Sequence, residues 1–138
     1  MKIAIRYYTK SGNSKKLADA ISEELGLPAL PVDQKLTEAV DVLFLCNSVY
    51  YAGVDNSVKQ FLKAPGAKIG KIVNVSTAAL IESTYSQMKK LASDAGIALA
   101  EKEFHCKGSF AMMNRGKPNE EDVRRVKQFA SEIAKETV

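Results

Sequence analysis

Short apolar runs alternate with amphipathic segments along most of the chain. Asp41–Ser48 contains a continuous apolar stretch, which is typical of a strand covered on both faces. Lys15–Leu25 instead places leucine or isoleucine at every fourth position and is followed by Gly26, a common helix end. The same reasoning predicts strands over 1–8, 28–32, 41–48, 71–76 and 97–106, helices over 15–25, 56–63 and 83–95, at most a brief helix over 33–40, and a last helix beginning after Asn119.

Strands separated by helices predict an α/β fold, with a doubly wound five-stranded parallel sheet in the order 2-1-3-4-5 and helices on both faces. No linker, repeat or low-complexity tract interrupts the chain, so we expect one domain over residues 1–138. Ligands of such sheets bind outside the carboxyl ends of the strands, where the strand order reverses. The loops at that point would be Thr9–Ser14 and Asn47–Gly53.

The first of these loops, T-K-S-G-N-S, joins the first predicted strand to the first predicted helix. Five of its six residues are Ser, Thr, Gly or Asn. Small hydroxyl residues around a glycine at a helix start favour an anion site, because the helix amides point outward there. Ser14 or Asn13 acting as an ordinary N-cap is the alternative, but a cap needs only one such residue.

Two further loops border the same expected crevice. The segment 47–53, N-S-V-Y-Y-A-G, places Tyr50 and Tyr51 beside the first loop, and a tyrosine face can stack on a flat heteroaromatic ligand. One of the two tyrosines is expected to pack under the following helix instead. Ser76–Ala79 follows the fourth strand, and its small residues let the backbone approach a ring.

Composition and charge narrow the functional classes. The net charge is +4 and the pI about 9.0, but the lysines are dispersed, so we expect neither nucleic-acid binding nor a membrane surface. No apolar run is long enough for a membrane span, and a strand starting at Met1 leaves no room for a targeting peptide. Cys46 and Cys106 lie in apolar runs, which indicates reduced thiols in the cytoplasm. One histidine and no paired cysteines make a metal site improbable.

Phosphate, ring-stacking and ring-edge loops in this order resemble the flavodoxin family. Its [S/T]-x-[S/T]-G-[N/T]-[S/T] loop is matched by residues 9–14, and the aromatic turn after its third strand is similar to L-C-N-S-V-Y-Y-A-G here. F-H-C-K-G-S-F at 104–110 and N-R-G-K-P-N at 114–119 also look like segments of small flavodoxin-like proteins. The likeness covers essentially the whole chain, in the short-chain form.

The resemblance implies that the chain binds FMN. It assigns the phosphate to Thr9–Ser14, one ring face to Ser48–Gly53 and the ring edge to Ser76–Ala78, with Tyr50 the better match to the stacking aromatic and Tyr51 its competitor. The implied cofactor-binding residues are Thr9, Lys10, Ser11, Gly12, Asn13, Ser14, Ser48, Val49, Tyr50, Tyr51, Gly53, Ser76, Thr77 and Ala78, with no catalytic residue and no metal ligand.

The chain departs from the family's pattern in two ways. Its fourth loop has no aromatic followed by Gly-Asp, which puts a second stacking ring in doubt. Electron-carrier flavodoxins are usually acidic, whereas this chain is basic. Other proteins of similar fold are excluded by missing residues: a response regulator needs carboxylates where Tyr8-Thr9 and Asn47-Ser48 stand, and a small tyrosine phosphatase needs a cysteine in the phosphate loop. A Walker-type phosphate loop is also absent, and His105 is expected to be a packing residue.

Two functional classes fit these observations. The resemblance favours an electron carrier that passes electrons between partner proteins, with a flavoprotein reductase or an iron–sulfur protein as donor and an acceptor that the sequence does not identify. A small FMN-dependent NAD(P)H oxidoreductase, of the quinone or flavin reductase type, is the alternative; residues 108–118 would then form a substrate lid. A flavin-free interaction module is the weakest reading, because the phosphate loop is intact. Whether the chain is an enzyme stays open, and a short chain favours the carrier.

Overall fold

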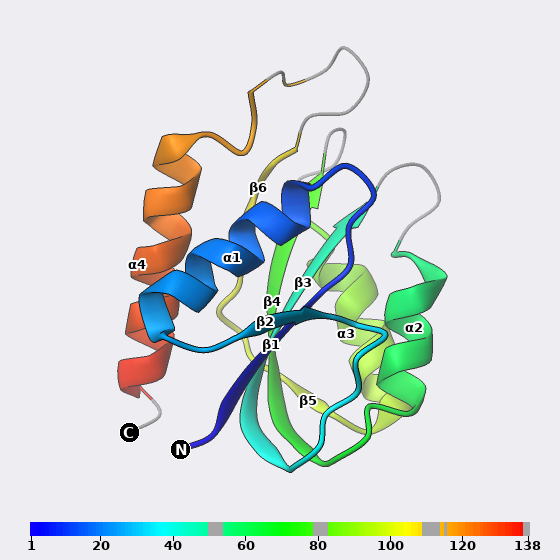
Figure 1. The fold of residues 1–138 in the computed structure, drawn as a ribbon. Helices are drawn as coiled ribbons and strands as arrows, with labels where there is room; N and C mark the ends of the chain where they lie inside the picture. The colour runs from blue at the N-terminus through cyan, green and yellow to red at the C-terminus, as the bar shows by residue number, and fades with distance from the viewer. Residues whose placement is uncertain (50–53, 79–82, 109–113, 115, 137–138) are drawn as a thin grey trace.

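The computed structural model describes residues 1–49, 54–78, 83–108, 114 and 116–136. In this part of the chain, six strands form one sheet at the centre of the molecule (Figure 1). Every pairing between these strands is parallel. The strands are β1 (Ile3–Tyr7), β2 (Ala29–Pro31), β3 (Val40–Val49), β4 (Ile69–Ala78), β5 (Ala98–Leu99) and β6 (Phe104–Lys107).

The sheet order is β2-β1-β3-β4-β5, and β6 also pairs with β4. This confirms the predicted order. β2 lies on one side of β1, and β3 lies on the other side. The order therefore reverses between β1 and β3, whose carboxyl ends are adjacent, with Tyr7 opposite Cys46. The doubly wound parallel architecture and the position of the switch point both follow from the alternating pattern of the sequence.

The prediction of one continuous strand over Ile97–Cys106 is wrong. β5 pairs with the start of β4, where Leu99 is opposite Ile72, and β6 pairs with its end, where Phe104 is opposite Val75. Phe104 is five residues beyond Leu99, but Val75 is only three beyond Ile72, so the segment between β5 and β6 must leave the line of pairing. The side chains of Glu101 and Lys102 are exposed there, which keeps their charges in water.

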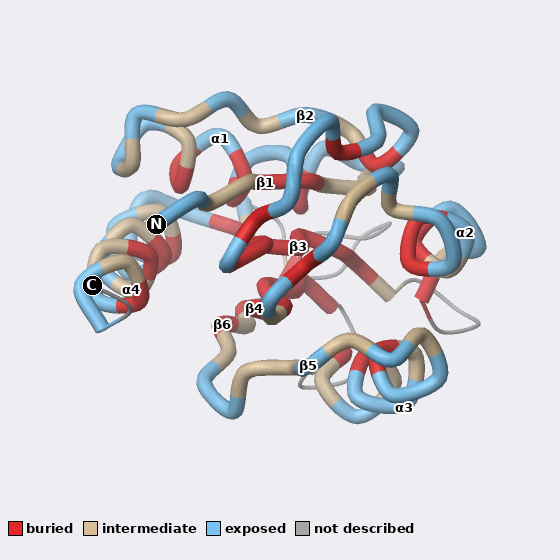
Figure 2. The backbone as a smooth tube through the Cα atoms, turned by 90° about the horizontal axis from the view of Figure 1, so that it is seen from below, coloured by how far each residue is buried: buried red, intermediate tan, exposed pale blue. Residues whose placement is uncertain are grey.

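Helices cover both faces of the sheet. α1 and α4 pack together on one face, and α2 and α3 on the other (Figure 2). Buried residues, red in Figure 2, follow the strands and the inner sides of the helices. The helices are α1 (Asn13–Leu25), α2 (Asn56–Lys63), α3 (Tyr85–Ala95) and α4 (Glu120–Glu136).

The segment between β2 and β3 forms turns, and no helix appears at 33–40. The buried Arg6 side chain accounts for its path: its Nε donates to the carbonyl of Gln34 at 2.6 Å and its Nη2 to that of Lys35 at 3.3 Å. The carbonyls of Gln34 and Lys35 are thus held by the Arg6 guanidinium and not by helical hydrogen bonds. Arg6 of β1 therefore fixes the path of the segment between β2 and β3.

Each face of the sheet has its own hydrophobic cluster. Successive residues of a strand point to opposite faces, and accordingly Phe44 packs beneath α1 and α4, whereas Leu43 and Leu45 pack beneath α2 and α3. All three side chains are fully buried. Met88 of the helix predicted over 83–95 is fully buried in the second cluster.

α4 begins directly after Asn119, as predicted, and two side chains cap its start. The side chain of Asn119 accepts a hydrogen bond from the backbone N–H of Asp122 at 3.0 Å, and the carboxylate of Asp122 accepts one from the N–H of Asn119 at 2.9 Å. These reciprocal bonds form a capping box and satisfy two backbone donors that the helix itself cannot. They fix the position where the chain returns from the loop region to the α1–α4 face.

Candidate functional site

The loop Thr9–Ser14 connects β1 to α1 at the carboxyl edge of the sheet. Gly12 directly precedes the helix with φ +90°, a conformation that residues with a Cβ rarely adopt. Its N–H donates to the hydroxyl of Thr9 at 2.8 Å, which closes the turn. A Cβ built on Gly12 would meet no atom within 4 Å. The loop is therefore an open cradle at the positive end of a helix, the arrangement that suits a phosphate.

Five of the six residues of this loop divide into two groups, and Thr9 is intermediate in exposure. Lys10, Ser11 and Gly12 are exposed, whereas Asn13 and Ser14 are buried. Neither Asn13 nor Ser14 is the N-cap of α1; Gly12 holds that position, and no side chain caps it. The ordinary-cap alternative is therefore wrong, because a glycine turn stands where a side-chain cap would be.

The Ser14 hydroxyl is joined to two other hydroxyls beneath the loops. It forms a hydrogen bond with Ser48 Oγ at the end of β3, and Ser48 Oγ in turn bonds Thr77 Oγ1 at the end of β4 at 2.7 Å. All three side chains are at most 2% exposed. This hydroxyl chain (Ser14, Ser48 and Thr77) ties together the three segments that the sequence predicted to share one crevice.

A second buried polar group lies on the opposite face of the same strand ends. The side-chain amide of Asn47 donates to Asn74 Oδ1 at 2.7 Å, and the hydroxyl of Thr84, just before α3, donates to Asn47 Oδ1 at 2.6 Å. Asn74 Nδ2 donates to Thr84 Oγ1 at 3.1 Å. None of these three side chains is exposed. This amide cluster (Asn47, Asn74 and Thr84) ties the start of α3 to the sheet.

The structure places the other predicted site residues only in part. Val49 ends β3 and forms an isolated antiparallel bridge with Val54, which brings the two ends of the second loop together. Ala78 ends β4 and is buried. Ser76 is buried on the face of the amide cluster, and its hydroxyl accepts from the N–H of Thr84 at 3.4 Å. The predicted residues Tyr50, Tyr51 and Gly53 lie outside the described part of the chain.

Gly108 belongs to this region, although sequence reasoning did not include it among the site residues. A Cβ on Gly108 would lie 2.7 Å from Asn13 Nδ2 and 3.1 Å from Thr77 Cβ, so a larger residue here would have to displace a side chain of the loop Thr9–Ser14 or of β4. Its carbonyl accepts from Asn114 Nδ2 at 3.4 Å. The available signal was a glycine immediately after a strand, which often marks a close backbone approach.

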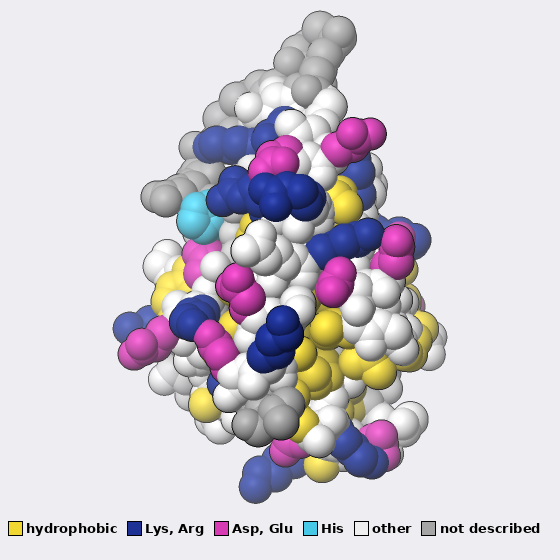
Figure 3. Space-filling model, turned by 90° about the vertical axis from the view of Figure 1, so that its left-hand side faces the viewer, with side chains coloured by type: hydrophobic (Ala, Val, Ile, Leu, Met, Phe, Trp, Pro, Cys, Tyr) yellow, Lys and Arg dark blue, Asp and Glu magenta, His cyan; other side chains and the backbone are white. Residues whose placement is uncertain are grey.

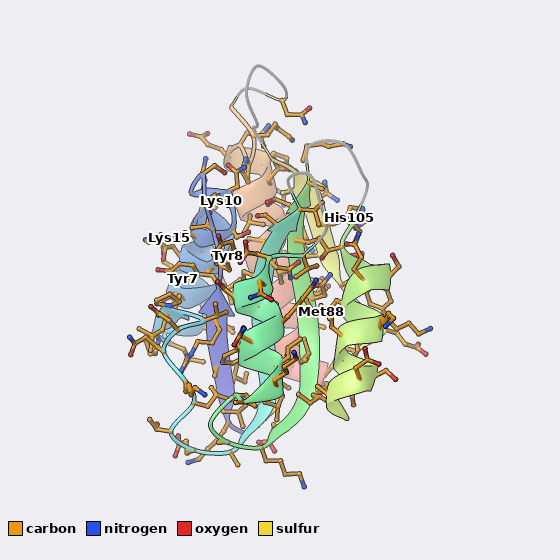
Figure 4. All side chains as sticks on the ribbon, turned by 90° about the vertical axis from the view of Figure 1, so that its right-hand side faces the viewer. Tyr7, Tyr8, Lys10, Lys15, Met88 and His105 are labelled. Atoms are coloured by element: carbon orange, nitrogen blue, oxygen red, sulfur yellow. The ribbon has the colours of Figure 1, made fainter. Side chains whose placement is uncertain are left out.

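Tyr8 and Asp55, which the sequence reasoning also missed, interact on the other side of the loop Thr9–Ser14. Asp55 caps α2 by accepting from the N–H of Ser57 at 2.8 Å. Burial tends to raise the pKa of Asp55, but hydrogen bonds from Ser57 and Tyr8, with the charge of Lys10, hold it below the ordinary value. A hollow of about 250 Å³ opens here, and Figure 4 shows Tyr7, Tyr8, Lys10 and Lys15 gathered on this side. It is lined by Tyr7, Tyr8, Thr9, Pro31, Val32, Asp33 and Ser57.

The two cysteines are free and buried, as the sequence predicted. Burial raises the pKa of the Cys46 thiol well above its ordinary value, and burial with the nearby Asp122 raises that of Cys106 to about 12. Both thiols are therefore protonated at neutral pH and poor nucleophiles. His105, expected to be a packing residue, is only partly buried and bonds Glu103 at 3.1 Å. Within the described ranges, no helix is long and apolar enough to cross a bilayer.

Comparison with other sequences gives little guidance. No protein-family model matches the chain. An uncharacterized protein of Methanocaldococcus jannaschii is 26% identical over 137 residues, which cover 89% of this chain and 91% of that protein. The similarity thus extends over nearly the full length of both chains, but it brings no function with it.

Comparison with solved structures is more informative. An archaeal flavodoxin superposes with a TM-score of 0.73 at 14% identity, over 99% of this chain and 98% of its own. Flavodoxin 1 of Bacillus cereus gives 0.72 at 15% identity, over 98% of both chains. A short-chain flavodoxin associated with a bacterial microcompartment gives 0.68 at 16% identity, over the full length of both. These likenesses cover the sheet, the helices and the order that connects them: the chain has the fold of the flavodoxins.

Proposed function

We propose that this protein binds FMN and transfers electrons between redox partners, as a flavodoxin does. One observation carries the proposal: Gly12 turns the chain with a positive φ into α1 and leaves open space over the helix start. The fold adds weight, because this loop stands at the point where the strand order reverses, between β1 and β3.

The phosphate of FMN would be held by Thr9–Ser14. Backbone N–H groups of the loop and the first turn of α1 are suited to bind its oxygens, together with the exposed side chains of Lys10 and Ser11. Asn13 and Ser14 are buried, so in this proposal they shape the loop from below. Bound FMN would supply a ring system that takes up and releases electrons.

The ring would lie between Ser48–Gly53 and Ser76–Ala78. The Ser48 and Thr77 hydroxyls already bond each other, so we assign these two side chains to holding the loops and leave ring contacts to the backbone and to an aromatic. Tyr50 keeps its place as the proposed stacking residue, with Tyr51 as competitor. A tyrosine stacked on the ring contributes about 0.5–1.5 kcal/mol beyond its area burial.

The carrier would receive electrons from a flavoprotein reductase or an iron–sulfur protein and pass them to a second protein. Two buried, protonated thiols suit a reducing cytoplasm, where we place it. Direct hydride transfer from a nicotinamide nucleotide would need contacts to that nucleotide's phosphates and ribose beyond those for FMN. The loop Thr9–Ser14 is assigned to FMN, and no other glycine-rich turn precedes a helix in the sequence.

The decisive experiment is reconstitution with FMN, followed by visible absorbance and quenching of flavin fluorescence, with mass analysis of the ligand released by heat. Gly12→Val should weaken FMN binding by about a hundredfold or more, because the side chain strains a left-handed turn and occupies the phosphate position. Gly26→Val is the matched control: Gly26 also has positive φ with nothing within 4 Å, but it ends α1 at the far side.

Both variants should fold, and only Gly12→Val should lose FMN. Equal affinity in the two variants, or bound FAD, would show that the phosphate site lies elsewhere. Stopped-flow bleaching of the flavin then separates carrier from reductase. We expect slow bleaching by NADH or NADPH alone and fast bleaching when a flavoprotein reductase is added; fast, saturable bleaching by the nucleotide alone would favour the reductase.

A further inference from the structure

A hollow of about 290 Å³ lies between β6 and the start of α4, outside the loops assigned to FMN. We call it the β6–α4 hollow. Most of the side chains that line it are lysine, arginine or histidine. It is lined by His105, Cys106, Lys107, Lys117, Asp122 and Arg125.

A fourth cation reaches this region from α1. Lys16 donates from Nζ to the carbonyl of Pro118 at 2.5 Å, so its ammonium lies beside the start of α4. The charges of Lys117, Arg125 and Lys16 all act to lower the pKa of Cys106, against the larger effect of burial. Lys16 of α1, Lys117 of the loop before α4 and Arg125 of α4 therefore converge on one part of the surface.

This convergence accounts for most of the protein's excess positive charge. Lys16, Lys107, Lys117 and Arg125 are four of the 20 basic residues, and Asp122 is one of the 16 acidic residues. Without these five, the chain has 16 basic and 15 acidic side chains and is nearly balanced. Figure 3 shows the basic side chains beside the single histidine on the α4 side of the molecule.

The hollow adjoins the proposed flavin site. β6 ends at Lys107, and the next residue, Gly108, is the one packed closely against Asn13 and Thr77. Lys117 lies one residue before Pro118, whose carbonyl is bound from α1. A macromolecule seated over the hollow would therefore lie beside the loops that we assign to FMN.

The chemistry of the hollow favours an acidic protein over a small anion. Asp122, only 2% exposed, lies inside it and pairs with Lys117 at 2.8 Å. A bare phosphate in the hollow would meet this carboxylate. Lys16, Lys107 and Arg125 are instead exposed around the hollow, where long flexible side chains attract a broad negative surface over a distance of about one Debye length, roughly 8–10 Å.

Nucleic acid fits less well. A phosphate backbone needs an extended row of cations, and bases need exposed aromatic rings. Here the cations surround one hollow, and the ring of Phe104 is buried beneath Arg125, whose guanidinium lies 5.9 Å from the ring centre. The sequence likewise has no row of lysines interleaved with aromatic residues.

We propose that the β6–α4 face is the docking surface for an acidic redox partner protein, so that this carrier presents positive charge to its partner. The proposal rests on the proposed electron-transfer function, but the docking itself does not require bound flavin. Because exposed charges act mainly on the rate of encounter, association should be fast at low ionic strength and should slow as salt is added.

The test uses two opposite probes, an acidic plant-type ferredoxin and basic cytochrome c, with isotope-labelled protein in flavin-free and FMN-loaded forms. Chemical-shift changes caused by the ferredoxin should map to β6 and the first turns of α4. Arg125→Glu and Lys107→Glu should each weaken ferredoxin binding about tenfold at low salt. Lys89→Glu, the same charge change on exposed α3, should change it less than about twofold.

Several results would overturn the proposal. No ferredoxin binding at low salt, shift changes confined to α2 and α3, tighter binding of cytochrome c, or stronger binding of a single-stranded oligonucleotide to the same face would each contradict it. Flavin occupancy is read separately from visible absorbance. If ferredoxin docks but the protein never takes up FMN, the proposed function is refuted and the docking surface stands. If the protein takes up FMN but ferredoxin does not dock, the docking surface is refuted and the proposed function stands.

Discussion

The ends of β3 and β4 carry two buried polar groups on opposite faces of the sheet, and the two groups are built differently. Asn47 and Ser48 are neighbours on β3, opposite Ser76 and Thr77 on β4. Because successive side chains alternate, one residue of each pair points toward α2 and α3 and the other toward α1. The first face contains the amide cluster, and the second contains the hydroxyl chain.

The amide cluster has a fixed order of donors and acceptors. Asn47 donates to Asn74 and accepts from Thr84, and Asn47 Nδ2 also donates to the carbonyl of Leu45 at 3.0 Å. Such a group has one arrangement, and each bond removed leaves a buried polar atom unsatisfied. The cluster is therefore suited to stabilise the fold at the start of α3.

The hydroxyl chain has no fixed order. Each hydroxyl of Ser14, Ser48 and Thr77 can donate or accept, so the direction of the whole chain can reverse without movement of a heavy atom. It also borders the loop that we assign to a phosphate. The difference indicates that the amide cluster serves stability, whereas the hydroxyl chain holds three loops in register with one another.

The largest expected effect is the loss of stability in Asn74→Ala. The change removes the bonds from Asn74 to Asn47 and Thr84, leaves Asn47 Nδ2 with backbone carbonyls as its acceptors and opens a space beside Thr84. We expect the free energy of unfolding to fall by about 2–4 kcal/mol, measured by urea denaturation. FMN affinity in the folded fraction should change by less than about threefold. A loss below about 0.5 kcal/mol would show that the cluster does not serve stability.

A smaller effect is expected for Gly108→Ala, which crowds the hydroxyl side. The new methyl would lie too close to Asn13 Nδ2 and Thr77 Cβ. Overpacking of this kind costs about 1–3 kcal/mol, and because the neighbours belong to the phosphate loop and the hydroxyl chain, FMN affinity should fall as well. Asn13→Ala combined with Gly108→Ala should restore part of the stability by providing space. Unchanged FMN affinity in a destabilised Gly108→Ala would separate Gly108 from the site.

Local sequence signals predicted some of these features and not others. α2 spans Asn56–Lys63 as predicted. Both signals for it, the apolar spacing within the helix and the Pro65-Gly66 pair just after it, are local in sequence. The capping box at Asn119 and Asp122 is local in the same sense. The gap between β5 and β6 depends on register against β4, which no pattern within that segment reveals.

The candidate site also has features that local sequence predicts and features that it does not. The cradle at Gly12 was predictable, since glycine at a strand-to-helix turn has a specific backbone role. The hydroxyl chain was not, because its bonds join residues 34 and 29 positions apart. Ser48 and Thr77 were chosen as ligand contacts by resemblance; their burial and mutual bond became visible only when the strands were paired. The role of Gly108 likewise depends on the ends of three separate elements.

Thr77→Val should have a milder effect and sharpen the comparison. Valine nearly preserves the shape of threonine but removes the bond to Ser48 Oγ. We expect a stability loss of about 1 kcal/mol and a fall in FMN affinity of about fivefold. The measurements are urea denaturation and a flavin fluorescence titration. A double-mutant cycle with Ser14→Ala should show coupling in FMN affinity through Ser48; additive effects would mean that the chain does not act as a unit.

The smallest effect should come from Asp55→Asn, at the rim of the face with the amide cluster. Asparagine still caps α2, so only the charge is lost. The pKa of Asp55 is held below its ordinary value, so the carboxylate contributes stability above the unfolded-state pKa, and that contribution disappears as pH falls through the lower folded-state pKa. The variant should therefore be less stable by a few tenths of a kcal/mol at neutral pH. Its unfolding free energy should converge with that of the parent in acid, and a difference that persists there would assign the effect to lost packing instead.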